Sequence, residues 1–409
     1  MKRVLVYSHD TFGLGNIRRM LTISQHLAAS DPDLSVLIVS GSPMLHAFRI
    51  PTRVDYLKLP CLARNLTGDY GVKFLDMSYE HTIRLRANLL TSTLLDFDPD
   101  LVITDKKPLG VGNELAPALE MVQRRGRRTK LVLLLRDILD APEATRAVWN
   151  KNGYFDAIER YYDQVLVVGS EDVFDLADEY GFPASARAKV RYCGYLRRER
   201  GRQVREHRSR FAPEGERMVL VTPGGGEDGH RLVSTYVDAL PAIGAGQRVR
   251  SVVVCGPEMS PAQRSATMDS VAQRTDVSVI EFCDDMMGLM EASDLVVAMG
   301  GYNTVCELLT LRKRAILVPR VTPVQEQWIR AQRLARLGLM RAIHPEQLTA
   351  HALAETVREE IDCVNVRPRA MYQLDLDGLE RVRESIQSLL PPTRADGSDE
   401  PFQLMAAQQ

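Results

Sequence analysis

The chain has almost no net charge and few cysteines, and each shortage excludes a class of protein. The formal net charge is -1, so no broad basic surface is available for nucleic acid. The cysteines (61, 193, 255, 283, 306 and 363) form no C-x-x-C pair, which is typical of reduced thiols and not of a disulfide framework or a zinc site. We therefore expect a cytoplasmic protein without a bound metal.

Long apolar segments are also absent. The N-terminus, MKRVLVYSHD, has an apolar run too short for the core of a signal peptide. No stretch approaches the roughly 18 apolar residues that cross a bilayer, so we expect no transmembrane segment. Hydrophobic residues still make up 45% of the 409 residues, which is enough for two or three domains with buried cores.

Two halves of the chain repeat one plan, in which short apolar strands alternate with amphipathic helices. Strands separated by helices predict parallel, doubly wound sheets, so the expected fold class is α/β with two Rossmann-like domains. The expected strands are 4–7, 35–39, 101–104, 130–135 and 164–168 in the first half, and 218–222, 251–255, 277–281, 295–298 and 315–318 in the second.

Composition marks the domain boundaries. Residues 196–217, LRRERGRQVREHRSRFAPEGER, lose apolar periodicity and are highly charged, which indicates a hinge with some helix between an N-terminal domain (1–195) and a C-terminal domain (218–375). The basic side chains either face water or direct Arg197 or Arg198 toward a phosphate in the cleft. A helix at 376–391 and a disordered polar tail at 392–409 are expected to follow.

The clearest functional signal lies in residues 281–309, EFCDDMMGLMEASDLVVAMGGYNTVCELL. After a short strand, Gly300 and Gly301 allow close approach of the backbone. Asn303 or Thr304 can cap the helix that follows. The N–H groups at a helix N-terminus suit phosphate oxygens, so this turn is a candidate phosphate site.

Glu307 follows within this helix and would accept hydrogen bonds from a ribose diol. The alternative is an ordinary strand-to-helix turn with a solvated glutamate that the helix dipole favours.

Each half has a glycine-rich loop after its first strand. In GLGNIR (13–18) the third glycine of the dinucleotide fingerprint is missing, which disfavours a dehydrogenase. PGGGEDG (223–229) is a candidate phosphate cradle, in which Glu227 and Asp228 point to solvent or help to hold a cation. Because ligands bind at the carboxyl ends of strands in open α/β sheets, both loops are expected to face one cleft.

The segment 281–309, followed by ILVPRVTPVQEQWIRAQRLARLGL (316–339), resembles the C-terminal domain of family 28, MurG-like glycosyltransferases over about residues 215–345. Over nearly its whole length the chain is similar to uncharacterised bacterial predicted glycosyltransferases that begin with an HDxxGLGH-type loop. The resemblance implies a GT-B fold, with two Rossmann-like domains facing across a cleft. The donor, most simply a UDP-sugar such as UDP-N-acetylglucosamine, would bind the second domain and the acceptor the first.

The resemblance also implies roles for single residues. Phe282 and Cys283 would frame the nucleobase, although Phe282 could equally belong to the core. Glu326 stands where the family has a glutamine that holds the donor sugar, and a carboxylate cannot donate as an amide does, so the sugar is left open. The segment around it could also be an ordinary polar helix start. The candidate donor-binding residues are Arg197, Gly224, Gly225, Gly226, Phe282, Cys283, Met287, Gly300, Gly301, Asn303, Thr304, Glu307, Gln325, Glu326 and Gln327.

The implied reaction is displacement of a nucleoside diphosphate at the anomeric carbon, with inversion and without a metal or other cofactor. It needs a general base and positive potential at the diphosphate. The related loops carry a histidine where this chain has Asn16, and an amide is no base. His9, Asp10 and Asp105 are the catalytic candidates, with Asp137 a further one, although a lone histidine at a strand end is often structural.

The acceptor is expected to bind near the first domain's strand ends. Candidate residues there are Gly13, Gly15, Asn16, Lys106 and Arg136, of which the two basic ones bind an anionic acceptor or face water. Residues 52–74 could form an acceptor loop. No basic amphipathic helix indicates a membrane surface, so a small molecule, a peptide and a lipid-linked acceptor all remain open.

Three functions therefore compete. The first is a nucleotide-sugar glycosyltransferase. The second is a non-hydrolysing sugar-nucleotide epimerase, which shares the fold. The third is a catalytically idle GT-B protein that binds a nucleotide or a partner, an alternative that Asn16 keeps open.

Overall fold

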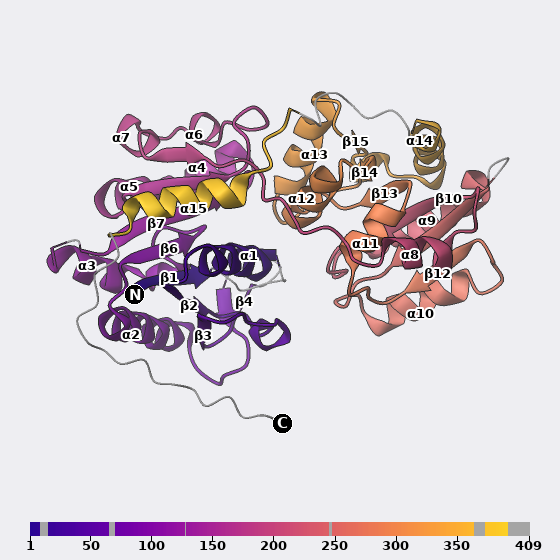
Figure 1. Ribbon diagram of the computed structural model, residues 1–409. Coiled ribbons are helices and arrows are strands. Elements are labelled where there is room, and N and C mark those ends of the chain that lie inside the picture. The colour runs from indigo at the N-terminus through magenta and orange to yellow at the C-terminus, as the bar shows by residue number, and fades with distance from the viewer. Residues whose placement is uncertain (9–14, 65–69, 127, 245–247, 364–372, 392–409) are drawn as a thin grey trace.

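Two parallel sheets form the centre of the computed structural model, as the alternation of apolar strands and helices predicts (Figure 1). The structure describes residues 1–8, 15–64, 70–126, 128–244, 248–363 and 373–391. The expected strands are found within a few residues of their predicted bounds, and those at Gln164–Val168 and Leu295–Ala298 coincide with them.

The first half of the chain contains a seven-stranded sheet and its helices. Its strands are β1 (Lys2–Ser8), β2 (Leu34–Ser40), β3 (Val54–Lys58), β6 (Leu101–Asp105), β7 (Lys130–Arg136), β8 (Gln164–Val168) and β9 (Val190–Tyr192), with a separate hairpin of β4 (Leu62–Arg64) and β5 (Tyr70–Val72). Its helices are α1 (Gly15–Ser30), α2 (Tyr79–Phe97), α3 (Ala116–Arg124), α4 (Pro142–Lys151), α5 (Tyr154–Tyr161), α6 (Leu176–Glu179) and α7 (Ala184–Arg187), with 3-10 turns η1 (Leu45–Ala47) and η2 (Val111–Asn113). The candidate acceptor loop 52–74 thus contributes β3 and the hairpin.

The second half contains a six-stranded sheet. Its strands are β10 (Arg217–Thr222), β11 (Val249–Val254), β12 (Val277–Ile280), β13 (Leu295–Ala298), β14 (Ala315–Leu317) and β15 (Arg341–Ala342). Its helices are α9 (His230–Ile243), α10 (Pro261–Ser270), α11 (Met286–Ala292), α12 (Tyr302–Leu311), α13 (Glu326–Arg336) and α14 (Ala350–Asp362), with the 3-10 turn η3 (Pro345–Gln347). The charged segment 196–217, expected to be a hinge with some helix, joins the two sheets and contains α8 (Val204–Phe211).

The strand order gives each sheet a switch point. The orders are β3-β2-β1-β6-β7-β8-β9 and β12-β11-β10-β13-β14-β15. In both, the order reverses beside the first strand, and ligands of doubly wound sheets bind outside the carboxyl ends of the strands at such a switch point. The switch points lie between β1 and β6 in the first sheet, and between β10 and β13 in the second.

Buried hydrophobic residues cover both faces of each sheet. Alternate residues of β1 belong to different clusters, with Val4 and Val6 on one face and Leu5 and Tyr7 on the other, as the two-residue period of a strand requires. The cluster that contains Val4 continues into the second domain. The rings of Tyr195 and Tyr302 stack at this junction with centroids 6.2 Å apart.

The C-terminal helix α15 (Gly378–Leu389) lies against the first domain, although it follows the second in the chain (Figure 1). The Gly378 N–H donates to the carbonyl oxygen of Tyr195 at 3.1 Å. A Cβ at this glycine would lie 2.7 Å from the carbonyl oxygen of Gly194, so the close approach requires glycine. Val382 and Ile386 are buried on the inner side of α15.

Candidate functional site

The glycine loop after β10 lies at the second switch point and packs closely against the loop after β11. Gly224 and Gly226 have φ values of 79° and 99°, a region that favours glycine. A Cβ on Gly226 would lie 2.4 Å from the carbonyl oxygen of Cys255, and one on Gly225 would lie 2.4 Å from a carboxylate oxygen of Glu258. Gly226 therefore packs against backbone and Gly225 against the end of a side chain, so a larger residue at position 226 would clash with the fold.

The predicted side-chain cap at the turn between β13 and α12 is not present. Gly301 is the N-cap of α12 and no side chain caps the helix, so neither Asn303 nor Thr304 has the expected capping role. The Asn303 side chain instead accepts a hydrogen bond from Arg198 at 2.7 Å and donates to the carbonyl oxygen of Gly15 at 3.1 Å. Contacts with the first domain and the linker thus replace the local cap.

Gly300 is needed for the approach of α13 to this turn. A Cβ at this position would lie 2.8 Å from the carbonyl oxygen of Gln327.

Glu307 lies at the wall of a cavity of about 460 Å³. The residue is only 4% exposed, so it is not the solvated helix glutamate of the alternative interpretation. Its Oε1 accepts a hydrogen bond from Arg18 Nη2 at 3.1 Å. The cavity is also lined by Met287, Gln203 and Asp285. Sequence reasoning missed Arg18, because nothing local shows that α1 of the first domain faces α12 of the second.

Phe282 and Cys283 line a second, smaller hollow of about 230 Å³. Phe282 is 57% exposed, so it is not a core residue. The two hollows share Gln203, Asp284 and Asp285 and therefore adjoin. An exposed aromatic ring beside a polar hollow is suited to stack on a planar ring.

The linker contributes Arg198 to the site, whereas Arg197 faces away from it. The Arg197 guanidinium donates to Asp377 at 2.9 Å, and both side chains are largely exposed. The prediction that Arg197 contacts a phosphate is therefore wrong, because its guanidinium pairs with Asp377, the residue before α15. Arg198 donates to Thr22 of α1 at 2.8 Å and to Asn303 of α12 at 2.7 Å, so it connects the two domains.

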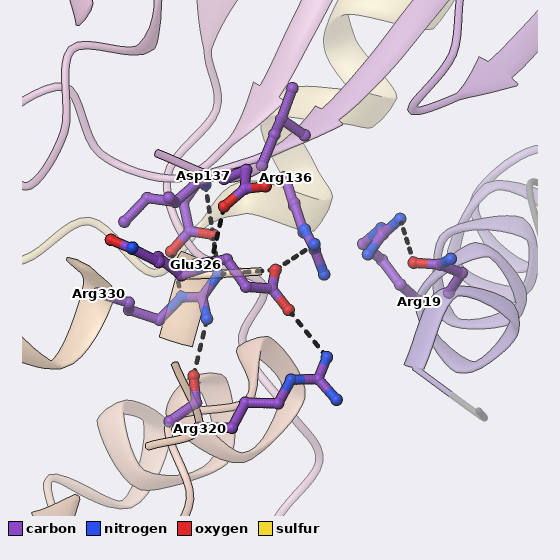
Figure 2. Close-up of polar contacts among 12 residues, drawn as sticks. Arg19, Arg136, Asp137, Arg320, Glu326 and Arg330 are labelled. Atoms are coloured by element: carbon purple, nitrogen blue, oxygen red, sulfur yellow. Dashed lines mark hydrogen bonds and ion pairs between the residues drawn. The ribbon is translucent and has the colours of Figure 1, made fainter. Parts of the chain in front are cut away.

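A buried ion pair joins the domains behind the turn (Figure 2). Arg330 of α13 donates through Nε and Nη2 to both carboxylate oxygens of Asp137, each at 2.7 Å, and the two side chains are 0% and 1% exposed. The remaining Arg330 nitrogen donates to the Gly300 carbonyl oxygen at 2.7 Å. Tyr195 donates to Asp137 at 3.2 Å. Asp137 therefore has no free carboxylate oxygen for a proton transfer.

Glu326, the candidate sugar-binding carboxylate, lies among arginines (Figure 2). It forms an ion pair with Arg136 at the end of β7, and lies 3.6 Å from Arg320 and 3.9 Å from Arg330. Burial alone would raise the pKa of Glu326, but Arg136 and then Arg330 outweigh it and hold the pKa below its usual value. Glu326 is therefore an anion that joins the domains.

The two neighbouring residues also have partners. The Gln325 N–H donates to Asp140 of the first domain at 2.8 Å, and Gln327 Oε1 accepts from the Arg320 N–H at 3.3 Å.

Asp105, at the end of β6, is fully buried and forms an ion pair with Arg19 at 2.5 Å. Arg19 also donates to the Asn16 side chain at 3.3 Å. The structure thus gives Asp105 a structural partner and no open side toward an acceptor. His9, Asp10 and Gly13 lie outside the described residues, and Gly15 is the first residue of α1.

Lys106 and Arg136 lie at the ends of the adjacent strands β6 and β7, where the structure brings them together as the strand pattern predicts.

No group of three or more potential metal ligands occurs in the described part of the chain. None of the described helices is both long and apolar enough to span a bilayer.

Comparisons with known proteins match the second domain. Residues 218–371 match the glycosyltransferase family 28 C-terminal domain. An uncharacterised glycosyltransferase of Methanopyrus kandleri is 27% identical over 178 residues, 44% of this chain and 47% of the relative. A UDP-N-acetylglucosamine–N-acetylmuramyl-(pentapeptide) pyrophosphoryl-undecaprenol N-acetylglucosamine transferase of Halorhodospira halophila is 33% identical over 182 residues, 44% of this chain and 49% of the relative. This chain thus matches about half the length of these curated relatives.

Solved structures match the whole architecture. MurG of Acinetobacter baumannii has a TM-score of 0.64 at 16% identity, covering 95% of this chain and 100% of that one. A putative UDP-N-acetylglucosamine 2-epimerase from Listeria monocytogenes has a TM-score of 0.62 at 13% identity, covering 95% and 96%. At such identities the likeness establishes the fold alone, and it confirms the arrangement of two Rossmann-like domains.

Proposed function

Because the chain has the GT-B fold and its second domain matches the C-terminal domain of family 28 glycosyltransferases, we propose that the protein is a glycosyltransferase. It moves a sugar from a nucleotide-sugar, most simply a UDP-sugar such as UDP-N-acetylglucosamine, to an acceptor at the first domain. The acceptor is a small molecule, a peptide or a lipid-linked group. All six cysteines are free, which suits a reducing compartment, and the proposal places the reaction in the cytoplasm.

The position of Glu307 carries this proposal. It is a buried carboxylate on α12 of the matched domain, beyond a Gly-Gly turn and beside a cavity that α1 and the linker also line. Arg18 occupies its Oε1, and in the proposed complex its Oε2 accepts hydrogen bonds from the ribose hydroxyls. Hydrogen bonds to a charged acceptor are stronger than neutral ones, at roughly 1.5–3 kcal/mol each. The adjoining hollow at Phe282 would receive the nucleobase.

Side chains of the cleft would stabilise the leaving diphosphate. The start of α12 and the loop after β10 follow the adjacent strands β13 and β10, so their backbone N–H groups would contact the diphosphate in the proposed complex. Arg136 and Arg320 would add positive charge beside them, which offsets the negative charge that develops on the leaving group. The proposed reaction is a direct, inverting displacement without a bound metal or other cofactor.

Glu307→Ala is expected to weaken binding of the donor roughly 10- to 100-fold, because the ribose loses a charged hydrogen-bond acceptor. Calorimetric titration of the purified protein with UDP, UDP-N-acetylglucosamine, UDP-glucose and GDP- or dTDP-sugars measures this. Glu355→Ala, on the exposed side of α14, is the matched control and should bind as the unaltered protein does. Equal affinity in Glu307→Ala would remove the ribose assignment, and no binding of any nucleotide by the unaltered protein would remove the proposed function.

An epimerase remains the second candidate, since a putative epimerase shares the fold. It would convert one nucleotide-sugar into its epimer without an acceptor. Nuclear magnetic resonance of the incubated donor distinguishes the two, because a glycosyltransferase leaves the sugar configuration intact until transfer. Binding without either conversion or transfer would favour an idle GT-B protein.

A further inference from the structure

The proposed reaction needs a group that accepts the proton of the incoming hydroxyl, and the described acids at the strand ends are engaged. Asp105 forms a fully buried ion pair with Arg19. Asp137 is held by Arg330 and Tyr195. Each carboxylate neutralises a buried cation, so protonation would leave that cation unpaired at a large free-energy cost. The proton acceptor must therefore be a different group.

Lys106 lies directly after β6 in an unusual backbone conformation. Its φ is 67°, which few residues other than glycine adopt. The Lys107 N–H donates to the Asp105 carbonyl oxygen at 2.8 Å across this residue, so Lys106 is the centre of a three-residue turn, and the positive-φ form of that turn is rare and strained. The Lys106 N–H is meanwhile fixed to the Leu134 carbonyl oxygen at 2.9 Å. Such strain occurs preferentially at functional sites.

The Lys106 ammonium has no hydrogen-bond or ion-pair partner among the described residues, although it is only partly exposed. Two other partly buried lysines are paired, Lys130 with Asp163 at 3.2 Å and Lys189 with three backbone carbonyls. Lys106 is thus held at the carboxyl ends of the first sheet's strands, and none of the described residues engages its amine.

Charges of both signs surround Lys106. Arg136 at the end of β7 and Lys107 disfavour its protonated form. Glu326 at the start of α13 and Asp105 favour it. Burial, followed by Arg136, lowers the pKa of Lys106 to about 7. At pH 7 about half of such amines are neutral, compared with roughly 1 in 3,000 for an ordinary lysine.

We propose that Lys106 is the catalytic base of the transfer, an inference that rests on the proposed function. The neutral Nζ takes the proton as the O–H bond of the acceptor breaks. The freed electron pair forms the bond from oxygen to the anomeric carbon, while the bond from that carbon to the donor phosphate breaks. The nucleoside diphosphate leaves with that electron pair, and Lys106 remains as an ammonium that later returns its proton to water.

Lys106→Arg tests this role, because arginine keeps the positive charge but cannot accept a proton near neutral pH. The assay measures release of nucleoside diphosphate from the donor that binds best, with water as the acceptor. We expect turnover to fall roughly 10²- to 10⁴-fold while the dissociation constant of UDP stays within a few fold. Lys107→Arg is the matched control, and it should keep full turnover.

The pH profile gives a second readout. Because the neutral amine is the active form, turnover of the unaltered protein should rise with pH to about 7 and then level off, and Lys106→Arg should lack this rise. Added small primary amines should restore turnover to Lys106→Ala. A structural role would produce neither effect.

Two results would overturn the proposal. One is turnover in Lys106→Arg within a few fold of the unaltered protein. The other is a pKa near 10 for the Lys106 amine in the complex with UDP. NMR of protein labelled with ¹⁵N-lysine measures this pKa, and the signal that is missing in Lys106→Arg assigns it. Both leave the donor site intact, whereas failure of the proposed function would appear earlier, as absence of nucleotide binding.

Discussion

Replacing Arg330 with methionine is expected to lower the free energy of unfolding by about 3–5 kcal/mol, because the substitution leaves Asp137 as an unpaired buried charge. The two side chains are 0% and 1% exposed and share two hydrogen bonds of 2.7 Å. Methionine retains much of the side-chain volume, so the effect reports the charge and not a cavity. Urea and thermal denaturation of the variant and the unaltered protein measure it.

Two further variants make the interpretation of Arg330→Met specific. The double variant Arg330→Met with Asp137→Leu removes both charges and should recover most of the lost stability. Arg3→Met breaks an ion pair with Asp98 that is 42% and 53% exposed, and it should cost less than about 1 kcal/mol. If Arg330→Met is as stable as the unaltered protein, the domains separate and water reaches Asp137. Small-angle scattering would then show a larger radius of gyration for the variant.

Glu114→Ala is expected to have an effect of similar size, about 3–5 kcal/mol, inside the first domain. Glu114 accepts hydrogen bonds from Arg86 Nε at 2.5 Å, from Arg86 Nη2 at 2.7 Å and from the Tyr7 hydroxyl at 2.6 Å. All three residues are at most 1% exposed. Alanine would leave the Arg86 cation and the Tyr7 hydroxyl without their partner.

The two buried clusters differ in how the protein can respond when one charged partner is removed. Asp137 and Arg330 belong to different domains, so domain separation can hydrate the remaining charge. Glu114, Arg86 and Tyr7 belong to one domain and can reach water only by unfolding. Glu114→Ala should therefore lower the midpoint of the first domain's unfolding without altering UDP affinity at 10 °C. A midpoint unchanged within 1 °C would contradict the assignment of this cluster as a stabilising core element.

The sequence was sufficient to predict the fold, because buried parallel strands are continuous apolar runs bounded by loop residues. The runs at 164–168 and 295–298 match β8 and β13 without adjustment. β3 was missed, because its sequence VDYLK mixes polar and apolar residues in an edge strand. The Gly-Gly turn and the carboxylate of Glu307 could be predicted because they are close together in the chain.

The cross-domain contacts could not be predicted from local pattern. Arg330 and Asp137 are separated by 193 positions, and Arg18 meets Glu307 across 289. Asn303 is of a residue type that often caps helices, but its side chain accepts a hydrogen bond from Arg198 instead. Lys106 is predicted from the sequence as a residue of the cleft, whereas its strained turn follows from how β6 ends against β7.

The return of α15 to the first domain determines where the protein can be divided. Val382 and Ile386 are buried there, and Gly378 is bonded to the backbone of Tyr195. A fragment ending at residue 195 would therefore present a bare apolar groove to solvent and tend to aggregate. Expression of the first domain by itself calls for a circular permutation or a short glycine-serine bridge that carries residues 376–391 along with it.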